Sequence, residues 1–554
     1  MKFIKYSLVC IFITALTINA KADESRDFQI AKNLEVLFNL YREININYVD
    51  EKDPGELMIN SAEGMLKNLD PYTEFISEDD LEDFEIMTTG KYGGIGALIR
   101  KNGEWVEITQ PYKGFPADKA GLKSGDRIVA IDGKDMHNAE SSTVSSLMKG
   151  EPGTSFKLTV KKFDTGEERT LTVNREVVTI SGVPYYGMIS ETVGYINQES
   201  FSEESSSDVR NAFIDLKNQG MKSLILDLRN NGGGIMQEAV KIVSMFVPKG
   251  SEVASIKGRV QEVSVSSKTS TEPIDTDIRI AVLINRGSAS ASEIVAGALQ
   301  DMDRAVIIGQ RSFGKGLVQS PRPLGYNSIV KITTGKYYIP SGRCVQAIDY
   351  SNVNEDGSVG YVPDSLIQEF RTANGRKVYD GGGIMPDIRI PSENISIFTL
   401  SLYSQGYLDD FSLEYIKGTG FTPVDPVNFR LSDSDYEKFI SYMEDKEVRV
   451  ESETKYVLEN LRATAEKEKY SDRIKDLLDS IETAVSKEKN AELREFRDEI
   501  SKIIEDNIIV YYYYNDGAIR HKLTNDPAVK EAVEILNNES EYNDILTNRD
   551  TDKK

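Results

Sequence analysis

A serine in a segment of small residues is the side chain of this chain best placed to act as a nucleophile. Ser290 stands in the segment G-S-A-S-A-S-E at 287–293, between the apolar run 280–284 and a stretch with helical spacing. Small neighbours leave its hydroxyl exposed at a helix N-terminus, where the first-turn amides favour a developing negative charge. A serine at that place can also be a simple helix cap, so this segment alone leaves both roles open.

A base for this serine must come from a residue other than histidine. The chain has only two histidines, His137 in a β-rich region and His521 near the C-terminus, and both lie outside the region that holds Ser290. Lys315 follows the apolar run 305–308 and has a glycine on each side, a pattern that is also typical of a surface charge. A buried lysine can accept a proton when desolvation lowers its pKa from about 10.4 toward the working pH. We therefore predict a Ser290/Lys315 dyad.

A third segment offers backbone amides to the same chemistry. The strand-like run 224–228 is followed directly by R-N-N-G-G-G at 229–234 and then by a helical stretch. Consecutive glycines let backbone N–H groups approach a ligand without obstruction, which suits an oxyanion hole. A glycine turn between a strand and a helix is common, so this segment is informative only together with the other two.

These segments resemble the signatures of the C-terminal processing (tail-specific) proteases, a family of Ser/Lys serine peptidases that carry a PDZ domain. The motifs are G-S-A-S-A-S-E at 287–293 and S-F-G-K-G-L-V-Q at 312–319, and as in that family the serine and lysine are 25 positions apart, with a glutamine four further on. The resemblance implies Ser290 as nucleophile, Lys315 as general base and Gln319 as the residue that orients the lysine amine. It also implies an oxyanion hole formed by the amides of Gly234 and Ala291.

The resemblance covers roughly residues 30–400 and has one clear departure. It includes Y-Y-I-P-S-G-R at 337–343 and G-I-M-P-D at 383–387. Between them the chain carries a long insertion, residues 345–382, which leaves the details of substrate access open.

The region 90–177 reads as short alternating strands with glycine turns and resembles the PDZ domain of this family. Its loop Y-G-G-I-G is similar to the loop whose amides hold the terminal carboxylate of a peptide. The substrate-binding residues implied are Tyr92, Gly93, Gly94, Ile95 and Gly96. Such a domain adds the tail of its ligand to a sheet edge as an extra strand. A PDZ domain that only packs against the protease body is the alternative.

Elements of two kinds alternate in the region that must position Ser290 and Lys315. Apolar strands are expected at 193–196, 223–228, 280–284 and 305–308, with helices at 205–219, 237–247 and 290–300 between them. This alternation predicts a layered α/β core with parallel strand pairs. By the resemblance, the fold is a multidomain α/β protein with a crotonase/ClpP-like protease core and an inserted PDZ domain.

The whole chain is expected to divide into five parts. They are a signal peptide at 1–22, a helical region at 23–88, the PDZ domain at 89–178, the protease core at 179–400 and a helical region at 401–554. Glycine and proline are absent from 432 to 506, as in a helical bundle that serves for packing or for dimerisation. The apolar, tyrosine-rich run 508–514 must be covered, so we expect it in a core or an interface.

The first 22 residues have the pattern of a cleavable export signal. Lys2 and Lys5 precede an apolar run at 7–18, which is followed by A-K-A at 20–22. The run is shorter than a bilayer-spanning helix needs, although an uncleaved anchor remains the alternative. We expect export, to the periplasm of a Gram-negative bacterium. Cleavage leaves Cys344 as the only cysteine, and with no histidine near it in sequence a packed residue is favoured over a reactive thiol.

The composition of the chain and the motifs that it lacks argue against several classes of partner. The formal net charge of −23 makes nucleic acid an unfavourable partner. The zinc-protease motif HExxH is absent, and no metal or cofactor is expected. The expected partners are protein or peptide substrates with free C-termini, together with a second copy bound through the C-terminal helices and an adaptor lipoprotein such as some relatives use.

Two other functions compete with proteolysis. A catalytically silent PDZ-containing scaffold is one, although such a protein would be free to lose the serine, lysine, glutamine and glycine loop that are all present here. An acyl-transfer or hydratase enzyme on the related crotonase fold is the other, and the PDZ-like region argues against it.

Overall fold

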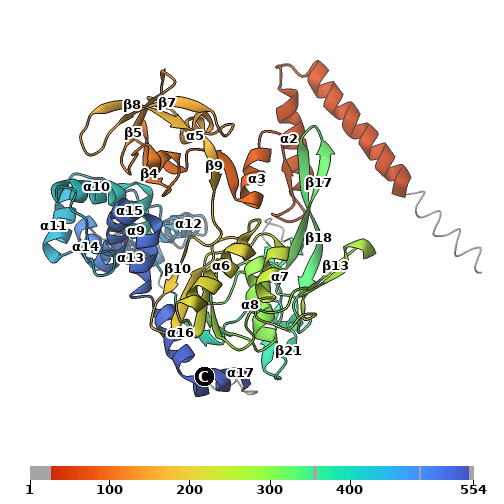
Figure 1. Cartoon of the computed structure of the whole chain (residues 1–554). Helices are drawn as coiled ribbons and strands as arrows, with labels where there is room; N and C mark the ends of the chain where they lie inside the picture. Colours follow the sequence, from red (N-terminus) through yellow and green to blue (C-terminus); the bar gives the residue numbers. More distant parts are fainter. Residues whose placement is uncertain (1–25, 354–358, 393, 486–487, 548–554) are drawn as a thin grey trace, which may run out of the picture. The chain divides into compact units, whose positions relative to one another are not determined.

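The computed structural model describes residues 26–353, 359–392, 394–485 and 488–547. The chain forms two compact units (Figure 1). The first contains the residues up to Leu81 together with Gln319–Thr333, and the second contains the remainder. The signal peptide predicted at 1–22 lies outside the described residues. None of the helices described is long and apolar enough to cross a membrane.

The first unit is built from helices and a β-hairpin. Residues 26–47 are helical, and α2 (Pro54–Leu66) begins after Asp53, whose carboxylate accepts the Glu56 N–H at 2.8 Å. An acidic N-cap followed by proline at the first helical position is a strong helix start. The short strand β1 (Glu74–Ile76) pairs antiparallel with residues 329–331 of β18 (Ser328–Tyr338), to which β17 (Leu317–Gly325) also pairs. The helical pattern predicted for the N-terminal region is therefore confirmed.

The β-rich region begins the second unit as a small antiparallel sheet. Its strand order is β3-β4-β5-β7-β8, with β6 paired to β5, so β3 is an edge strand. A separate ribbon of β2 and β9 connects this sheet to the rest of the chain. The strands are β2 (Lys91–Gly94), β3 (Ala97–Asn102), β4 (Trp105–Pro111), β5 (Arg127–Ile131), β6 (Lys134–Asp135), β7 (Ser155–Lys161), β8 (Glu168–Asn174) and β9 (Glu176–Thr179), and the helices are α3 (Leu81–Thr89), α4 (Pro116–Lys119) and α5 (Ser141–Met148).

A six-stranded sheet forms the second part of this unit. Its order is β10-β11-β12-β15-β16-β23, and all neighbours except β10 and β11 are parallel. The apolar runs of the sequence become fully buried strands, as is usual for a parallel sheet covered on both faces. The strands are β10 (Tyr185–Met188), β11 (Val193–Asn197), β12 (Ser223–Asp227), β15 (Arg279–Ile284), β16 (Val306–Gly309) and β23 (Ile388–Arg389). The predicted layered α/β fold with parallel strands is confirmed.

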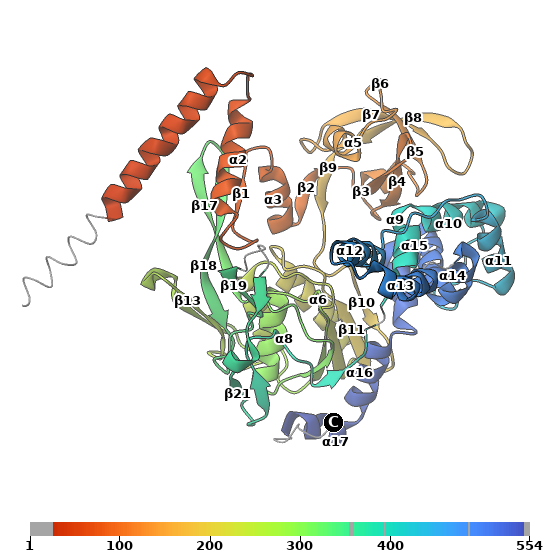
Figure 2. The same ribbon diagram turned by 180° about the vertical axis from the view of Figure 1, so that it is seen from behind.

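Helices from distant parts of the chain cover the two faces of this sheet. On one face, α6 (Ser205–Asn218), α7 (Met236–Val243) and α8 (Ala291–Asp301) pack in a continuous apolar core. On the other face lie α16 (Pro527–Asn537), which contacts β12, β15 and β16, and α17 (Glu539–Thr547), which contacts β16. Figure 2 shows α16 below β11, with α17 beyond it toward the end of the chain. The Tyr542 hydroxyl accepts the Ile280 N–H at 3.0 Å. The end of the chain therefore completes the layer that supports β15.

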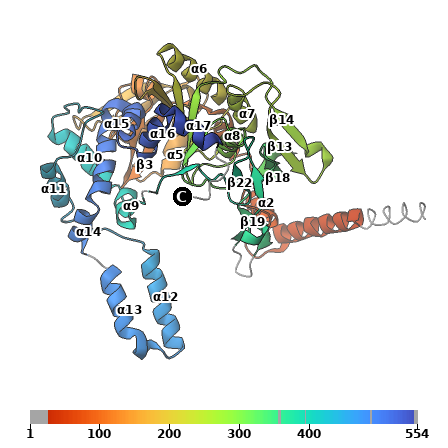
Figure 3. The same ribbon diagram turned by 90° about the horizontal axis from the view of Figure 1, so that it is seen from below.

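The remaining C-terminal helices form their own core. They are α9 (Ile397–Ser404), α10 (Tyr407–Gly418), α11 (Asp433–Tyr442), α12 (Glu453–Lys467), α13 (Ser471–Val485), α14 (Lys489–Glu495) and α15 (Arg497–Leu523). Helices α12 and α13 form a hairpin that projects away from the others in Figure 3, held by ion pairs from Arg462 to Asp479 and Glu482. The predicted helical bundle is confirmed.

Shorter elements complete the second unit. The strands β13 (Glu252–Gly258) and β14 (Val265–Lys268) pair beside residues 335–338 of β18. The insertion 345–382 contains two small ribbons, β19 (Ile348–Val353) with β20 (Val359–Tyr361) and β21 (Glu369–Arg371) with β22 (Lys377–Tyr379). Single helical turns lie at η1 (Gln261–Val263) and η2 (Asp364–Leu366).

Candidate active site

Three loops meet at one edge of the six-stranded sheet. They follow β12, β15 and β16, which are parallel neighbours, so their carboxyl ends share that edge. The Ala289 N–H and the Ser292 hydroxyl both donate to the carbonyl of Asn231, at 3.0 and 2.8 Å. The Phe313 N–H donates to the carbonyl of Ser288 at 2.9 Å. The three predicted segments are therefore brought together and tied by direct hydrogen bonds.

Ser290 is the N-cap residue of α8 and has an unusual backbone. Its φ of 56° and ψ of −113° are rare for any residue except glycine, and such conformations concentrate at functional sites. The side chain is half-buried. Gly233 packs directly against it, because a Cβ on Gly233 would lie 2.7 Å from the Ser290 Cβ and 2.9 Å from the Ala291 nitrogen. The glycine loop after β12 thus packs directly against Ser290.

Two amides near Ser290 remain available for a ligand. Within the described chain, the N–H groups of Gly234 and Ala291 make no hydrogen bond, whereas the Gly233 N–H donates to Asn231 Oδ1 at 2.9 Å. Gly234 has a φ of 143° and lies against Phe201, where a Cβ would come within 2.5 Å of a carbonyl oxygen. A glycine at 234 is therefore required by packing, and its amide is free to bind an oxyanion.

A buried carboxylate joins the loops of the predicted nucleophile and base. Glu293 is fully buried, and its Oε2 accepts the N–H of Ser290 at 2.9 Å and the N–H of Lys315 at 2.8 Å. Its Oε1 accepts the Gly314 N–H at 2.7 Å and the Ser312 hydroxyl at 2.6 Å. Burial raises the pKa of this carboxyl to about 7, against the lowering effect of the donors. Because one oxygen atom binds both backbones, Glu293 sets how Ser290 and Lys315 stand to each other.

Sequence reasoning did not assign a role to Glu293. A signal for it was present, because S-A-S-E at 290–293 fits the capping-box pattern, in which the third residue of the helix returns to the N-cap N–H. The bonds to Gly314 and Lys315 cross between two loops, and no local pattern reveals such contacts.

The segment at Gln346 and Ala347 packs closely on the two glycines that flank Lys315 and leaves no room for a side chain at either position. A Cβ on Gly314 would lie 2.4 Å from the Cβ of Ala347, and one on Gly316 would lie 2.8 Å from the nitrogen of Gln346. The Gly316 N–H donates to Gln346 Oε1 at 2.7 Å. The start of the insertion 345–382 therefore packs on the lysine loop, and Lys315 itself is half-buried.

Gln319 belongs to the first compact unit. Its Nε2 donates to the Thr333 hydroxyl at 3.1 Å, and that hydroxyl donates to Asp70 at 3.1 Å. The role predicted for Gln319, orienting the lysine amine, stays a prediction.

The two histidines lie outside the sheet that carries Ser290, as predicted. His137 contacts Glu104 at 3.2 Å in the β-rich region, and His521 on α15 contacts Asp506 at 3.1 Å. Burial raises the pKa of the Cys344 thiol, which disfavours the thiolate and agrees with a packing role. No group of histidine, cysteine or acidic side chains in the described ranges could hold a metal ion.

The predicted tail-binding loop lies at the start of the edge strand β3. Tyr92 and Gly93 pair with β9, whereas Ile95 is buried in the core of the domain and its carbonyl accepts the Ala117 N–H at 2.8 Å. Gly96 has a φ of 70°, which favours glycine, and β3 begins at the next residue. Burial and then the neighbouring Tyr112 raise the pKa of the Tyr92 hydroxyl to about 12. The loop thus leads directly into a strand whose outer edge is unpaired within the described sheet.

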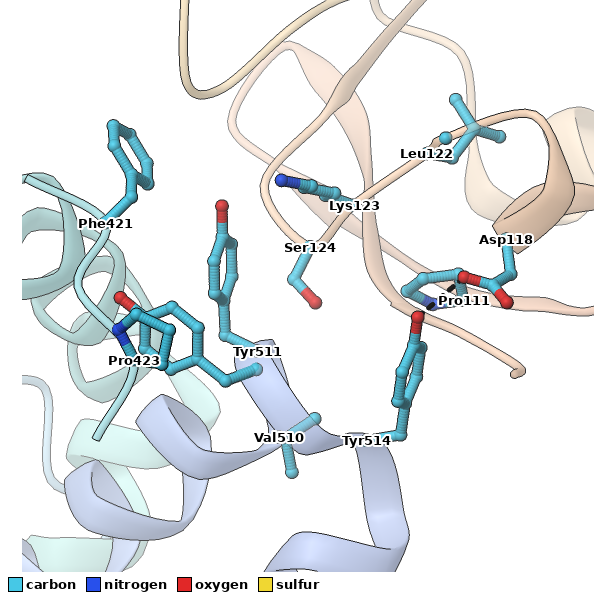
Figure 4. Close-up of a pocket in the computed structure, with 12 residues that line it drawn as sticks. Pro111, Asp118, Leu122, Lys123, Ser124, Phe421, Pro423, Val510, Tyr511 and Tyr514 are labelled. Atoms are coloured by element: carbon cyan, nitrogen blue, oxygen red, sulfur yellow. Dashed lines mark hydrogen bonds between the residues drawn. The ribbon is translucent and has the colours of Figure 1, made fainter. Parts of the chain in front are cut away.

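The β-rich domain also contacts the C-terminal helices, beside a cavity of about 320 Å³ that Figure 4 shows. Tyr511, Tyr512 and Tyr514 of the run 508–514 line it, and the Tyr514 hydroxyl donates to Asp118 at 2.6 Å. Arg100 on β3 forms ion pairs with Asp409 and Asp410 on α10. The expectation that this run lies in an interface is confirmed.

Profiles of three families match consecutive parts of the chain. Peptidase family S41 matches residues 192–359, a PDZ domain matches 107–162, and the C-terminal helical domain of probable PDZ-proteases matches 398–536. The first two matches fall on the six-stranded sheet and on the small antiparallel sheet, respectively.

Individual proteins are also similar to this chain. The carboxy-terminal-processing protease of Bartonella bacilliformis is 34% identical over 342 residues, covering 61% of this chain and 76% of that protein. A probable CtpA-like serine protease of Staphylococcus aureus is 34% identical over 315 residues, covering 56% of this chain and 62% of that protein. Among solved structures, the photosystem II D1 C-terminal processing protease is 27% identical with a TM-score of 0.36, covering 65% of this chain and 93% of that one. The chain belongs to peptidase family S41, among the carboxy-terminal-processing serine proteases that carry a PDZ domain.

Proposed function

We propose that the chain is an exported endopeptidase that hydrolyses peptide bonds with a Ser290/Lys315 dyad and selects its substrates by their C-terminal tails. The observation that supports the dyad most directly is the shared oxygen of Glu293, which accepts the backbone N–H of both residues. Membership in a serine peptidase family and the absence of a histidine from the sheet edge both favour a lysine base.

In the first half of this reaction, the neutral Lys315 amine removes the proton from the Ser290 hydroxyl as the oxygen attacks the substrate carbonyl. The negative charge that develops on the carbonyl oxygen is stabilised by the N–H groups of Gly234 and Ala291. Both amides are without a partner in the described chain, so they need not break a bond to serve. Gln319 orients the lysine amine in this proposal.

In the second half, the C–N bond breaks and the departing amine takes its proton from the Lys315 ammonium. A water molecule then gives a proton to the restored neutral amine and attacks the acyl-enzyme. Collapse of that intermediate returns the proton to Ser290 and releases the new carboxyl terminus. The cycle needs a lysine whose pKa is lowered by desolvation, because only the neutral amine is a base.

The tail of the substrate would pair with β3. That strand has an unpaired edge, and it is preceded by the backbone of Gly94, Ile95 and Gly96 where a terminal carboxylate can be held. A substrate with a free carboxylate should then be cut about ten- to a hundredfold faster than its C-terminal amide, since charge-assisted hydrogen bonds are lost in the amide. Equal rates for the two would assign this domain to packing alone.

Three further proposals concern the setting of the reaction. Export, to the periplasm of a Gram-negative bacterium, is supported by the signal pattern at 1–22. Self-association through the C-terminal helices is supported by exposed apolar side chains on the α12–α13 hairpin, among them Tyr456 and Leu477 at 65% exposure each. Delivery of substrates by an adaptor lipoprotein completes the proposal and rests on the family resemblance alone.

The test of the dyad is cleavage of an unfolded protein with a free C-terminus by wild type, Ser290→Ala and Lys315→Ala. Each variant should lose cleavage to background with an unchanged circular dichroism spectrum, because nucleophile and base act as one unit. Ser207→Ala and Lys249→Ala, at exposed positions, are the matched controls and should cut as wild type does. Cleavage by Lys315→Ala at a near wild-type rate would remove the lysine base. Tail binding without cleavage by the wild type would instead favour the scaffold function.

A further inference from the structure

Three arginines gather around a hollow at the same sheet edge as the catalytic loops. The hollow has a volume of about 530 Å³, and its basic lining residues are Arg286, Arg311 and Arg389. They come from the ends of β15, β16 and β23, which are parallel neighbours. The other lining residues are Gly309, Gln310, Met385, Ile390, Pro391 and Ser392.

The hollow adjoins the catalytic loops through the chain itself. Arg286 precedes Ser290 by four residues, and Arg311 precedes Lys315 by four. The two segments run together from the strand ends to the active site, because the Gln310 N–H donates to the Ile284 carbonyl at 3.0 Å and the Phe313 N–H donates to the Ser288 carbonyl at 2.9 Å. Arg286 and Arg311 therefore stand on the two paired segments that lead to Ser290 and Lys315.

Within the described ranges, no acidic side chain neutralises the positive charge of this cluster. None of the described residues that line the hollow is acidic, and neither Arg286 nor Arg311 forms an ion pair with a described residue. Asp387 is the nearest acid in sequence to Arg389, but its carboxylate is bound by Arg376 and by the Ile307 N–H at 2.8 Å. In the part of the chain that the structure describes, the Arg389 guanidinium donates only to the Met385 sulfur, at 3.2 Å. Three guanidinium groups without a carboxylate partner among the described residues constitute a local site for an anion, even in a chain of net charge −23.

The walls of the hollow indicate which anion fits. Met385, Ile390 and Pro391 supply apolar surface, which suits the methylene groups that carry a side-chain carboxylate. The strong negative charge of the whole chain repels large polyanions. A single carboxylate on a peptide, in contrast, interacts mainly with the nearby arginines. We propose that Arg286, Arg311 and Arg389 form a subsite that binds an acidic side chain of the substrate polypeptide near the bond to be cut.

This subsite rests on the proposed function, so the experiment distinguishes a failure of the subsite from a failure of the peptidase activity. Quenched fluorescent peptides of one apolar sequence, all with amidated C-termini, carry a single Glu at successive positions around the cleaved bond, and a matched set carries Gln. For at least one position the wild type should cut the Glu peptide with a kcat/KM about ten- to a hundredfold above that of the Gln peptide. The ratio should shrink as ionic strength rises toward about 0.5 M, since the site is open to solvent.

The arginines are then replaced together as Arg286→Gln, Arg311→Gln and Arg389→Gln. The Glu/Gln ratio of kcat/KM should fall to about one. A control variant with Arg169→Gln, Arg210→Gln and Arg259→Gln changes the net charge equally at exposed sites and should keep the wild-type ratio. Fluorescence anisotropy of a labelled Glu peptide on Ser290→Ala, with and without the three substitutions, measures the loss of binding without turnover.

Three results would overturn the inference. A ratio near one in the wild type at every position, with both peptide sets cut, removes the subsite and leaves the peptidase intact. A Glu/Gln ratio of kcat/KM that the three arginine substitutions leave unchanged also removes the subsite. A preference for a free C-terminal carboxylate over its amide, with no preference for a side-chain Glu, shows that only terminal carboxylates are recognised. If the wild type cuts neither these peptides nor the same peptides with free C-terminal carboxylates, the proposed function itself fails.

Discussion

The catalytic sheet edge and the contact between the PDZ domain and the C-terminal helices are packed in opposite ways. At the sheet edge, the Glu293 carboxylate accepts four hydrogen bonds, and a single added carbon on Gly233 would collide with Ser290. At the PDZ contact a cavity of about 320 Å³ remains, and the buried Tyr511 hydroxyl has no partner among the described residues.

This difference follows from what each region must do. The proposed acyl transfer requires Ser290, Lys315 and the oxyanion donors to be held within fractions of an ångström, and the cross-linked loops of the sheet edge meet this requirement. A domain that captures tails and presents them gains from a contact that opens at small free-energy cost. We therefore expect substitutions at the sheet edge to have large effects on activity and stability, and substitutions at the PDZ contact to have small ones.

Outside the proposed dyad, the largest effect is expected for Glu293→Gln. The NH2 group of glutamine must replace one of the two carboxylate oxygens, each of which accepts two donors, so two of the four hydrogen bonds between Glu293 and its neighbours would be lost. We expect kcat/KM to fall about a hundredfold or more, with most of the loss in kcat, because geometry and not binding is lost. Steady-state cleavage of an unfolded protein measures this. The exposed Glu252→Gln is the control, and wild-type kcat in Glu293→Gln would contradict the positioning role.

One glycine from each region allows the tightness of packing to be compared directly. Gly233 and Gly121 both have positive φ, 97° and 73°, but a Cβ on Gly233 meets atoms at 2.7 Å whereas one on Gly121, at the rim of the PDZ cavity, meets nothing within 4 Å. Gly233→Ala should therefore lower the free energy of unfolding by about 3 kcal/mol or more, and Gly121→Ala by about 1 kcal/mol, the backbone strain alone. Urea denaturation followed by circular dichroism tests this, and equal losses at both sites would refute the contrast in packing.

The buried carboxyl also gives the sheet edge a pH dependence. Burial raises the pKa of Glu293 from 4.5 to about 7. The folded protein holds this proton more tightly than the unfolded chain does, so the resulting stability is complete below about pH 4.5 and is lost as the pH rises through about 7. Relative to Glu293→Gln, which does not titrate, the wild type should lose about 3 kcal/mol of unfolding free energy between these pH values. Urea denaturation at a series of pH values measures the difference, and parallel curves for the two proteins would show that Glu293 does not titrate in this range.

The smallest effect is expected at the PDZ contact. The ion pair of Arg100 with Asp409 is about one quarter exposed on each side, so its contribution to stability is screened by solvent. A double-mutant cycle of Arg100→Ala and Asp409→Ala should give a coupling of about 1 kcal/mol or less in the free energy of unfolding. Hydrogen exchange should speed up in β3 and α10 and stay unchanged at the catalytic loops. A coupling of several kcal/mol would mean that this contact is as rigid as the sheet edge.

Local patterns in the sequence predicted the elements of the core and the segments of the active site. The apolar runs at 223–228, 280–284 and 305–308 became adjacent parallel strands, and parallel order alone brings their carboxyl ends to one edge. The helix predicted at 237–247 ends at Val243, although the following residues stay buried in turns. Apolar spacing indicates burial, and it does not mark where hydrogen-bonded turns stop.

Contacts between distant parts of the chain could not be predicted in this way. The cover of the sheet by α16 depends on the ion pair between Arg229 and Asp526, at 2.7 Å, and on side chains more than two hundred residues from the strands that they touch. The bonds from Glu293 to the lysine loop and the arginine hollow are further examples. No short-range periodicity encodes them, because each depends on how completed elements meet.

The backbone of Ser290 makes this position a site of trade-off between stability and activity. Its φ of 56° and ψ of −113° suit glycine and disfavour any residue with a Cβ, by an amount on the order of 1–3 kcal/mol. The proposed reaction accounts for a serine at this strained position, because it needs a hydroxyl at the N-terminus of α8. The inactive variant with glycine at 290 would gain by relief of strain and lose about 0.5–1 kcal/mol through the greater freedom of its unfolded chain. In this protein the most stable residue at the centre of the active site is one that cannot catalyse the reaction.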